Sequence, residues 1–265
     1  GAAVTVVERA AAPGGKLRAL GAAAIDSGPT VLTLRDVFED LFAAAGRDFA
    51  SYVKLEPAEV LARHAWSATE RLDLFASRER SVDAIGAFAG AADARGYERF
   101  ATDAARLCAA LDRTFMRAPR PRHALALAAA LGLRGNRALL RASPFRSLAG
   151  ALTRYFRDAR LRQLFGRYAT YCGSSPWEAP ATLMLVAQVE MDGVWSVDGG
   201  MVELARMLAR VARRHGAIGV VFWPQSGEYL NTTSFLTSDD YLARLQVCVI
   251  EGSFADVALF TDGVE

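Results

Sequence analysis

A short run of β-branched residues that ends in a carboxylate constrains the fold of this 265-residue chain most strongly. Residues 3–8 read AVTVVE, and a continuous run of this kind is typical of a buried strand in a parallel sheet. In dinucleotide-binding βαβ units, an acid at the end of the second strand accepts hydrogen bonds from the ribose hydroxyls of the adenosine half. Glu8 is therefore a candidate ribose ligand, although acids also end strands by chance.

A glycine turn follows this strand closely. Five residues separate Glu8 from Gly14-Gly15-Lys16, and Arg18 comes two residues later. A backbone without side chains lets a pyrophosphate or a flavin approach closely, and Lys16 or Arg18 supplies positive charge. An ordinary glycine turn with an exposed lysine explains the same residues equally well.

Hydrophobic periodicity predicts two amphipathic helices outside a mainly helical region at about 80–170. The first helix begins near Thr33 and stops at Gly46, and the second extends from Met201 to His215. The apolar face of the first is Val37, Phe38, Leu41, Phe42 and Ala45, and that of the second is Met201, Leu204, Ala205, Leu208 and Val211. Strand-like pieces occur at 52–55, 71–75 and 220–223, and in the tail at 245–250 and 257–260.

Charge divides the chain near residue 217. Residues 1–217 hold 30 basic and 22 acidic residues, whereas residues 218–265 hold one basic residue, Arg244, and seven acidic ones. Such a shift marks a domain boundary or a junction between unrelated coding segments. Three scattered cysteines form neither a disulfide framework nor a metal-ligand spacing, so no metal site is predicted and small buried thiols are the simplest reading.

The segment 117–146 combines a short apolar stretch with many arginines. Residues 123–133 read HALALAAALGL, which is too short to span a bilayer. Seven arginines and no acid occur between residues 117 and 146, namely Arg117, Arg120, Arg122, Arg134, Arg137, Arg141 and Arg146. This pattern is typical of a monotopic anchor on anionic lipid, and a buried helix with solvated ends is the alternative. Nucleic acid is not an expected partner, because no aromatic residues alternate with these arginines.

Three blocks of sequence resemble the carotenoid (phytoene-type) desaturases. The first runs from Val6 through the glycine turn and continues with Asp26-Ser27-Gly28-Pro29-Thr30. The second is RLRQLFGRYATY at 160–171, followed by GSSP at 173–176, and the third is GVWSVDGGM at 193–201. The sequence of these blocks is most similar to bacterial 1-hydroxycarotenoid 3,4-desaturases, and the resemblance covers roughly residues 1–217.

The resemblance implies an α/β fold, in which a partial Rossmann-type FAD-binding fold is joined to a predominantly helical region that faces substrate and membrane. It implies FAD as cofactor and removal of two hydrogens from an acyclic, 1-hydroxylated carotenoid, with hydride transfer to flavin. The residues it assigns to the cofactor are Glu8, Gly14, Gly15, Lys16, Arg18, Asp26, Gly28, Pro29 and Thr30. For Tyr168 and Tyr171 it suggests a lining of the substrate channel, and a place in the helical core is the alternative.

The resemblance also predicts how the chain is divided. It implies a remnant of the FAD domain at 1–33, a substrate domain at 34–217 and an unassigned β-like tail at 218–265. The G-x-G-x-x-G turn of the family is expected before residue 1, and the family's C-terminal part has no counterpart here, so loss of tight FAD binding and an inactive fragment are expected. A bacterial protein of the cytoplasm, bound peripherally to the membrane, follows from the substrate class.

Two other functions remain open at this level. One is another flavin oxidoreductase of the amine-oxidase-like superfamily, and the other is a non-catalytic module that binds lipid or carotenoid. His64, His123 and His215 are scattered and are most simply surface residues. The sequence leaves the catalytic residues and the oligomeric state unknown.

Overall fold

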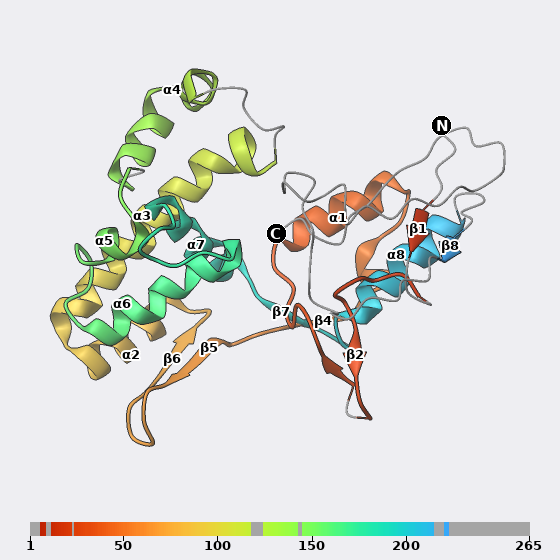
Figure 1. Cartoon of the computed structure of the whole chain (residues 1–265), viewed down its shortest axis with the longest axis horizontal. Helices are drawn as coiled ribbons and strands as arrows, with labels where there is room; N and C mark the ends of the chain where they lie inside the picture. The colour runs from red at the N-terminus through yellow and green to blue at the C-terminus, as the bar shows by residue number, and fades with distance from the viewer. Residues whose placement is uncertain are drawn as a thin grey trace, which may run out of the picture. The chain divides into compact units, whose positions relative to one another are not determined.

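A computed structural model describes residues 6–8, 12–22, 24–117, 124–142, 145–214 and 220–222 (Figure 1). The chain forms two compact units. One consists of Gly1–Leu32, Asp36–Glu56 and Ser196–Val264, and the other consists of Thr33–Arg35, Pro57–Trp195 and Glu265. We call them the discontinuous unit and the helical unit. The predicted boundaries at 33/34 and 217/218 stay a prediction.

The discontinuous unit contains short paired strands and two helices. Its strands are β1 (Val6–Glu8), β2 (Ala19–Leu20), β3 (Ile25–Asp26) and β8 (Val220–Phe222), and its helices are α1 (Arg35–Ala44) and α8 (Val202–Arg214), with the turn η1 (Phe49–Ser51) after α1. β1 pairs with β8 in parallel, and β2 pairs with β3 antiparallel. Strand β4 (Leu55–Pro57) pairs with β7 (Trp195–Val197).

Helix α8 confirms the prediction made for Met201–His215. Four residues of the predicted apolar face are buried and Leu208 is half-buried, Met207 is buried in addition to the predicted face, and Arg206 and Arg210 are exposed. The helix forms because apolar residues recur every three or four positions and bury one face.

Helix α1 buries a narrower face than the sequence predicts. Phe42 is buried and makes edge contacts with Phe49 and Tyr52, and Phe38 stacks on Phe49 with ring centroids 6.0 Å apart. Val37 and Leu41, which were predicted to share this face, are 43% and 52% exposed. The aromatic contacts align the helix on its i, i+4 row of phenylalanines, and the neighbouring row is left at the surface.

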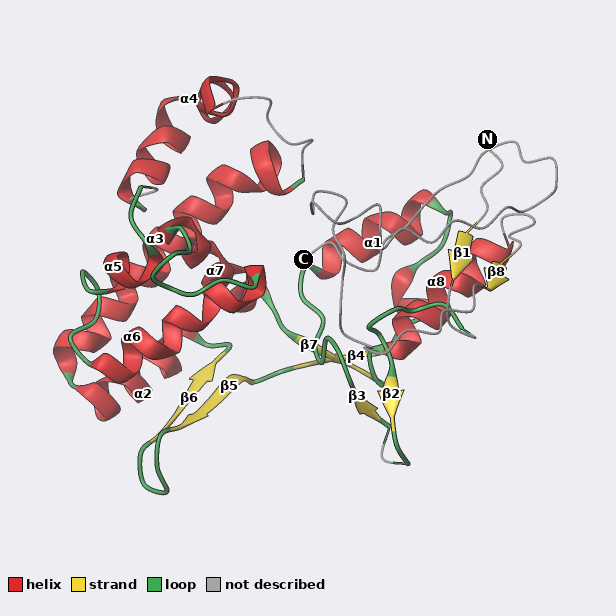
Figure 2. Ribbon diagram, in the orientation of Figure 1, coloured by secondary structure: helices red, strands yellow, loops and turns green. Residues whose placement is uncertain are grey.

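The helical unit begins with an antiparallel hairpin. Strands β5 (Val60–Ala65) and β6 (Arg71–Phe75) pair with a bulge near Val60, and Trp66 N–H donates to Glu70 O at 2.9 Å across the hairpin end. β6 was predicted, but the bulge disturbs the alternation that would have revealed β5. The predicted strand at 52–55 is wrong over 52–54, because β4 starts only at Leu55. In Figure 2 the hairpin projects beside the helices of this unit.

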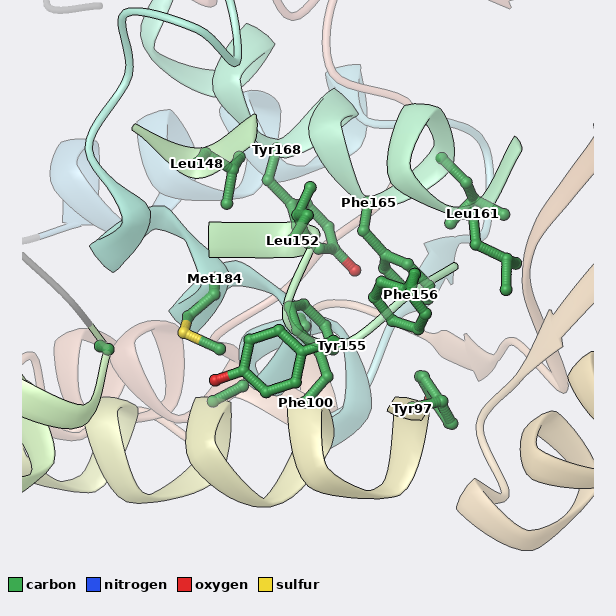
Figure 3. Close-up of a cluster of buried hydrophobic side chains, with 14 of the residues drawn as sticks. Tyr97, Phe100, Leu148, Leu152, Tyr155, Phe156, Leu161, Phe165, Tyr168 and Met184 are labelled. Carbon is green, nitrogen blue, oxygen red and sulfur yellow. The ribbon is translucent and has the colours of Figure 1, made fainter. Parts of the chain in front are cut away.

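Helices make up the rest of this unit, as the sequence predicts for 80–170. They are α2 (Arg78–Ala89), α3 (Ala91–Leu111), α4 (Ala124–Arg141), α5 (Leu148–Leu152), α6 (Ala159–Gly166) and α7 (Leu185–Asp192), with the turns η2 (Asp112–Met116), η3 (Arg167–Cys172) and η4 (Ala181–Met184). One aromatic and aliphatic cluster forms their core, as Figure 3 shows for Phe100, Phe156 and Phe165. Gly96 on α3 is essential to this packing, since a Cβ there would lie 1.9 Å from the carbonyl oxygen of Tyr155.

The described residues combine helices and strands, as the predicted α/β class requires. The predicted tail strands at 245–250 and 257–260 lie outside the described residues, and only β8 represents the tail. No helix within the described ranges has the length and apolarity needed to cross a membrane.

Candidate functional site

The predicted cofactor residues of the discontinuous unit come together through the β2–β3 hairpin. Pairing of Ala19 with Asp26 brings the segment after the glycine turn beside the segment that precedes Gly28. Ser27 N–H donates to Arg18 O at 2.8 Å, which fixes the two segments together. A Cβ on Gly28 would lie 2.3 Å from Lys16 O, so only glycine fits this approach.

The glycine turn itself has backbone angles that favour glycine. Gly14 and Gly15 have φ values of 145° and 54°, and Leu17 N–H donates to Gly14 O at 2.8 Å. A Cβ on Gly15 would meet no atom within 4 Å, so the turn faces open space. Lys16 and Arg18 are exposed beside it. A bare backbone next to two cations suits an anionic cofactor group such as a diphosphate.

Helix α8 completes this region from the far end of the sequence. The Met201 N–H donates to Asp26 Oδ1 at 3.0 Å, and a Cβ on Gly14 would lie 3.3 Å from the Cβ of Ala205. Gly199 and Gly200, with φ values of 83° and 85°, turn the chain into the helix. The sequence analysis quoted these glycines only as part of the family resemblance and gave them no role. A pair of glycines directly before a predicted helix is the signal that could have marked them as a turn.

The structure describes fewer contacts for the other predicted cofactor residues, Pro29, Thr30 and Glu8. Pro29 and Thr30 are exposed in the irregular segment that follows Gly28. Glu8 is the last residue of β1, opposite Phe222 of β8, and its side chain lies outside the described part. The structure therefore brings Gly14–Arg18 and Asp26–Gly28 together, and the place of Glu8 relative to them stays a prediction. Among the described residues, no group of three or more His, Cys, Asp or Glu side chains is arranged to hold a metal.

A buried carboxylate organises a second polar cluster, in the helical unit. Glu190 of α7 is 7% exposed and accepts hydrogen bonds to both its oxygens. Arg167 Nη2 donates to them at 2.9 and 2.7 Å, and the hydroxyls of Tyr168 and Tyr171 donate at 3.1 Å each. A buried charge with this many donors is compensated for its lost hydration.

This cluster gives Tyr168 and Tyr171 a defined place. Tyr168 is 1% exposed in the core, whereas Tyr171 is 60% exposed with only its hydroxyl end partly buried. Burial, with Glu190 nearby, raises the pKa of both tyrosines, and that of Tyr168 lies well above its usual value, so both remain neutral donors at neutral pH. A channel-lining role stays a prediction. Sequence reasoning missed Arg167 and Glu190, and an acid between the apolar residues Val189 and Met191 was the available signal.

His64 was expected at the surface, and the structure corrects this. It is half-buried on β5, stacks on Trp66 at 6.0 Å, and its Nδ1 is buried without a hydrogen-bond partner. Desolvation by burial, together with the charge of Arg167, lowers the pKa of His64. The cysteines were expected to be buried thiols. This is confirmed for Cys108, which is buried, and is wrong for Cys172, which is exposed at the end of η3.

Helix α4 presents the predicted apolar and basic surface. Leu133 and Leu140 are 82% and 65% exposed. Arg137 and Arg141, four and eight residues after Leu133, are exposed on the same side of the helix. Leu125 and Arg134 of α4, and Phe145 and Arg146 after it, are also exposed. Leu131 of α4 belongs to the buried core of the helical unit, and α4 packs against α3 (Figure 1).

The chain is similar to carotenoid desaturases over most of its length. It is 50% identical over 216 residues to hydroxyneurosporene desaturase of Rubrivivax gelatinosus, covering 80% of this chain and 41% of that protein. It is 47% identical over 219 residues to the protein of the same name from Cereibacter sphaeroides, covering 82% and 44%. Phytoene dehydrogenase of Streptomyces griseus is 34% identical over 227 residues, covering 82% and 43%. The chain thus spans less than half the length of these relatives.

Two further comparisons involve other proteins. The family model described as protein phosphatase 2C matches residues 128–265, slightly more than half of the chain. Only 127 residues precede the phosphatase match, whereas the desaturase similarity spans 216 residues. The two similarities therefore overlap. Within the overlap, α5, α6 and α7 share one core with α3, which precedes residue 128. A redesigned triple mutant of putrescine oxidase gives a TM-score of 0.44 at 16% identity, covering 83% of this chain and 44% of that one. A TM-score this low does not establish a common fold.

Proposed function

We propose that this chain, which belongs to the carotenoid desaturase family, is part of an FAD-dependent desaturase acting on a hydroxylated acyclic carotenoid. Through residues 128–265 the chain also belongs to the protein phosphatase 2C family. The observation that carries this proposal is the 43–50% identity to three proteins named hydroxyneurosporene desaturase. The name of those relatives supplies the hydroxylated substrate class.

Desaturation requires that two neighbouring carbons of the polyene each lose one hydrogen, one as hydride and one as a proton. FAD supplies the hydride acceptor when it is bound. In this proposal Glu8 binds the ribose, the Gly14-Gly15 turn lets the diphosphate approach, and Lys16 and Arg18 neutralise its charge. The open space at Gly15 and the exposed cations support this assignment, and the parallel β1–β8 pair supports a Rossmann-type arrangement.

The cofactor assignment is tested by titrating the purified chain with FAD and following flavin fluorescence. We expect saturable quenching, weakened about 5- to 30-fold when Lys16→Glu and Arg18→Glu are combined, because each reversed charge near a diphosphate costs about 0.5–1 kcal/mol. Arg47→Glu changes an exposed charge of the same unit outside the site and serves as the control. Absence of saturable quenching, or an equal loss in the control, contradicts the assignment.

We further propose that the surface of α4 binds anionic membranes peripherally. The segment 124–146 carries four exposed arginines and the exposed apolar residues Leu125, Leu133, Leu140 and Phe145, and its sequence contains no acid. Apolar side chains enter the headgroup boundary while arginines contact lipid phosphates, and each basic residue near the surface contributes about 1 kcal/mol. A carotenoid resides in the bilayer, so this surface gives the protein access to its substrate.

Vesicle flotation tests the membrane proposal. We expect binding to vesicles with anionic lipid that weakens at high salt and falls about 100-fold or more when Arg134→Glu, Arg137→Glu and Arg141→Glu are combined. The matched control reverses three exposed arginines elsewhere in the helical unit, with Arg71→Glu, Arg95→Glu and Arg99→Glu. Equal binding of both triple variants and the unaltered chain would refute a role for α4.

The match to protein phosphatase 2C favours a second candidate function. We propose that this function belongs to the segment after residue 217, where the composition turns acidic and where the desaturase resemblance stops. The core shared by α3, α5, α6 and α7 supports assigning residues 128–214 to the desaturase part. Release of phosphate from a phosphopeptide by the full chain, lost on removal of residues 223–265, is the expected result, and no phosphate release refutes this candidate.

Product analysis separates the proposed desaturase from its rivals. In cells that make hydroxylated acyclic carotenoids, the desaturase forms a product with one more conjugated double bond. Another flavin oxidoreductase binds FAD without forming this product. A lipid- or carotenoid-binding module does neither.

A further inference from the structure

Two buried polar atoms of the helical unit have no hydrogen-bond partner. Among the described residues, the buried side-chain nitrogens and oxygens left in this state are His64 Nδ1 and Arg167 Nη1. An unsatisfied buried polar group costs about 1–3 kcal/mol, so native proteins rarely keep one without a bound partner. The two atoms have opposite capacities. A guanidinium nitrogen only donates, whereas the unprotonated nitrogen of a neutral imidazole accepts.

A chain of contacts through Trp66 and Gln163 places these two side chains in the same part of the helical unit. His64 stacks on Trp66, and the indole Nε1 of Trp66 donates to Gln163 Oε1 at 2.8 Å. Gln163 lies four residues before Arg167, so both lie on one side of consecutive helical turns. The charge of Arg167 is near enough to lower the pKa of His64. Strand β5 and the end of α6 therefore present an acceptor and a donor to the same region.

Arg167 is held so that one nitrogen remains available. Its Nη2 makes both hydrogen bonds to Glu190, and its guanidinium lies over the ring of Tyr168 at 4.6 Å. Glu190 therefore fixes the orientation of the guanidinium and leaves Nη1 for another partner. The lowered pKa keeps His64 neutral near pH 7, which preserves an imidazole acceptor.

We propose that His64 Nδ1 and Arg167 Nη1 recognise the hydroxyl group of a hydroxylated carotenoid, and so determine specificity for it; this inference rests on the proposed desaturase function. A hydroxyl is at once a donor and an acceptor, and it satisfies both atoms by donating to Nδ1 and accepting from Nη1. Beside the pair, Trp66 stacks on both His64 and Phe88, and the Arg160 guanidinium lies over Phe88 at 4.1 Å, so in this proposal the polyene contacts the edges of these rings. A carotenoid without the hydroxyl leaves both atoms unsatisfied, which disfavours its binding.

The test measures binding of two carotenoids to the full chain in detergent micelles. The probes are hydroxyneurosporene and the same polyene without the hydroxyl, and quenching of the fluorescence of the four tryptophans reports binding. We expect the hydroxylated compound to bind about 10-fold or more tightly than its parent. His64→Phe keeps the ring stack but removes the acceptor, and it should weaken binding of the hydroxylated compound about 3- to 10-fold with the parent unchanged.

A second variant addresses the donor. Arg167→Lys keeps a positive charge for Glu190 and removes Nη1, and it should reduce selectivity about 10-fold or more. Arg63→Gln, at an exposed residue adjacent to His64 and paired with Asp73, is the matched control and should leave both affinities unchanged. Thermal unfolding verifies that each variant folds, and His64→Phe decides the matter if Arg167→Lys does not fold.

Three results overturn the inference: equal affinity for the two carotenoids, no binding of either, or an equal loss for both in His64→Phe. The last result indicates that a water molecule, rather than substrate, joins the two atoms. Failure of the proposed function is distinguishable. Selective binding without FAD binding leaves the inference standing and refutes the desaturase, whereas desaturation without selectivity does the reverse.

Discussion

Buried carboxylates fix the backbone of the helical unit at single positions. Asp93, near the start of α3, is 3% exposed and accepts the Arg157 N–H at 2.6 Å and the Asp158 N–H at 3.4 Å. These residues are more than 60 positions away in sequence, and Asp158 in turn caps α6 by accepting from Arg160 N. One side chain thus links the start of α3 to the entry of α6.

Removal of this carboxylate should destabilise the protein. Asp93→Ala removes the acceptor of the Arg157 and Asp158 N–H groups, which is expected to lower the free energy of unfolding by about 2 kcal/mol. Urea unfolding followed by circular dichroism measures the change. Asp83→Ala, at an exposed position of α2, is the control and should stay within about 0.5 kcal/mol of the unaltered chain. Equal effects of the two substitutions contradict the role of Asp93.

The lowered pKa of His64 predicts a pH dependence of stability. The folded protein binds a proton on His64 less readily than the unfolded chain, the histidine of which titrates near 6.5. The stabilising contribution is therefore present above pH 6.5 and is lost as the pH falls below it. An NMR titration should give His64 a midpoint below 6.5. A midpoint at or above that value contradicts burial beside Arg167.

Residue patterns predicted single positions only where the chemistry was local. The turn glycines were visible because their angles need a missing Cβ, and the structure gives Gly14 and Gly15 positive φ values. The ion pair of Arg167 with Glu190 joins residues 23 positions apart, and no spacing rule links η3 to α7. The unpartnered state of His64 depends on the same long-range packing.

At the scale of single elements, α4 is the least regular helix of the described chain. Gly132 interrupts it with φ 60° and ψ −170°, and Asn136 Nδ2 donates at 2.7 Å to both Ala128 O and Gly132 O. The asparagine therefore satisfies carbonyls that the interrupted helix leaves unpaired. The kink separates the segment with Leu125 from the segment with Leu133 and Leu140.

Asn136→Ala tests this account of the kink. Loss of two hydrogen bonds to backbone carbonyls should lower the free energy of unfolding by about 1–2 kcal/mol and speed amide hydrogen exchange in α4. Arg137→Ala, at the next position and exposed, should change neither quantity appreciably. Unaltered exchange in Asn136→Ala would show that the asparagine does not hold the kink.

Periodicity predicted elements well where one face meets one core. Helix α8 and strand β6 follow this rule, although Met207 of α8 is buried outside the predicted face. Helix α1 departs from it because aromatic contacts to Phe49 select only part of its apolar face. Strand β5 was missed because a bulge shifts its register, and a bulge depends on the partner strand.

At the scale of the whole chain, the structure describes two compact units, each with its own group of polar residues. The discontinuous unit gathers the glycine turn, Asp26 and the start of α8, which are far apart in sequence. The helical unit holds the Glu190 cluster and the α4 surface. The family resemblance predicted the residues of the first site, whereas the second polar cluster required the tertiary packing. The proposed recognition of the substrate hydroxyl by His64 and Arg167 assigns substrate selection to the helical unit, and the proposed FAD residues belong to the discontinuous unit.

The central claim is that this chain takes part in flavin-dependent desaturation of a hydroxylated carotenoid. The most direct measurement mixes the full chain with FAD and hydroxyneurosporene without oxygen and records the absorption spectrum over time. The account predicts a shift of the carotenoid bands to longer wavelength, because one conjugated double bond is gained, with loss of oxidised-flavin absorption in equal amount. Bound FAD that stays oxidised beside an unchanged carotenoid spectrum would contradict the account.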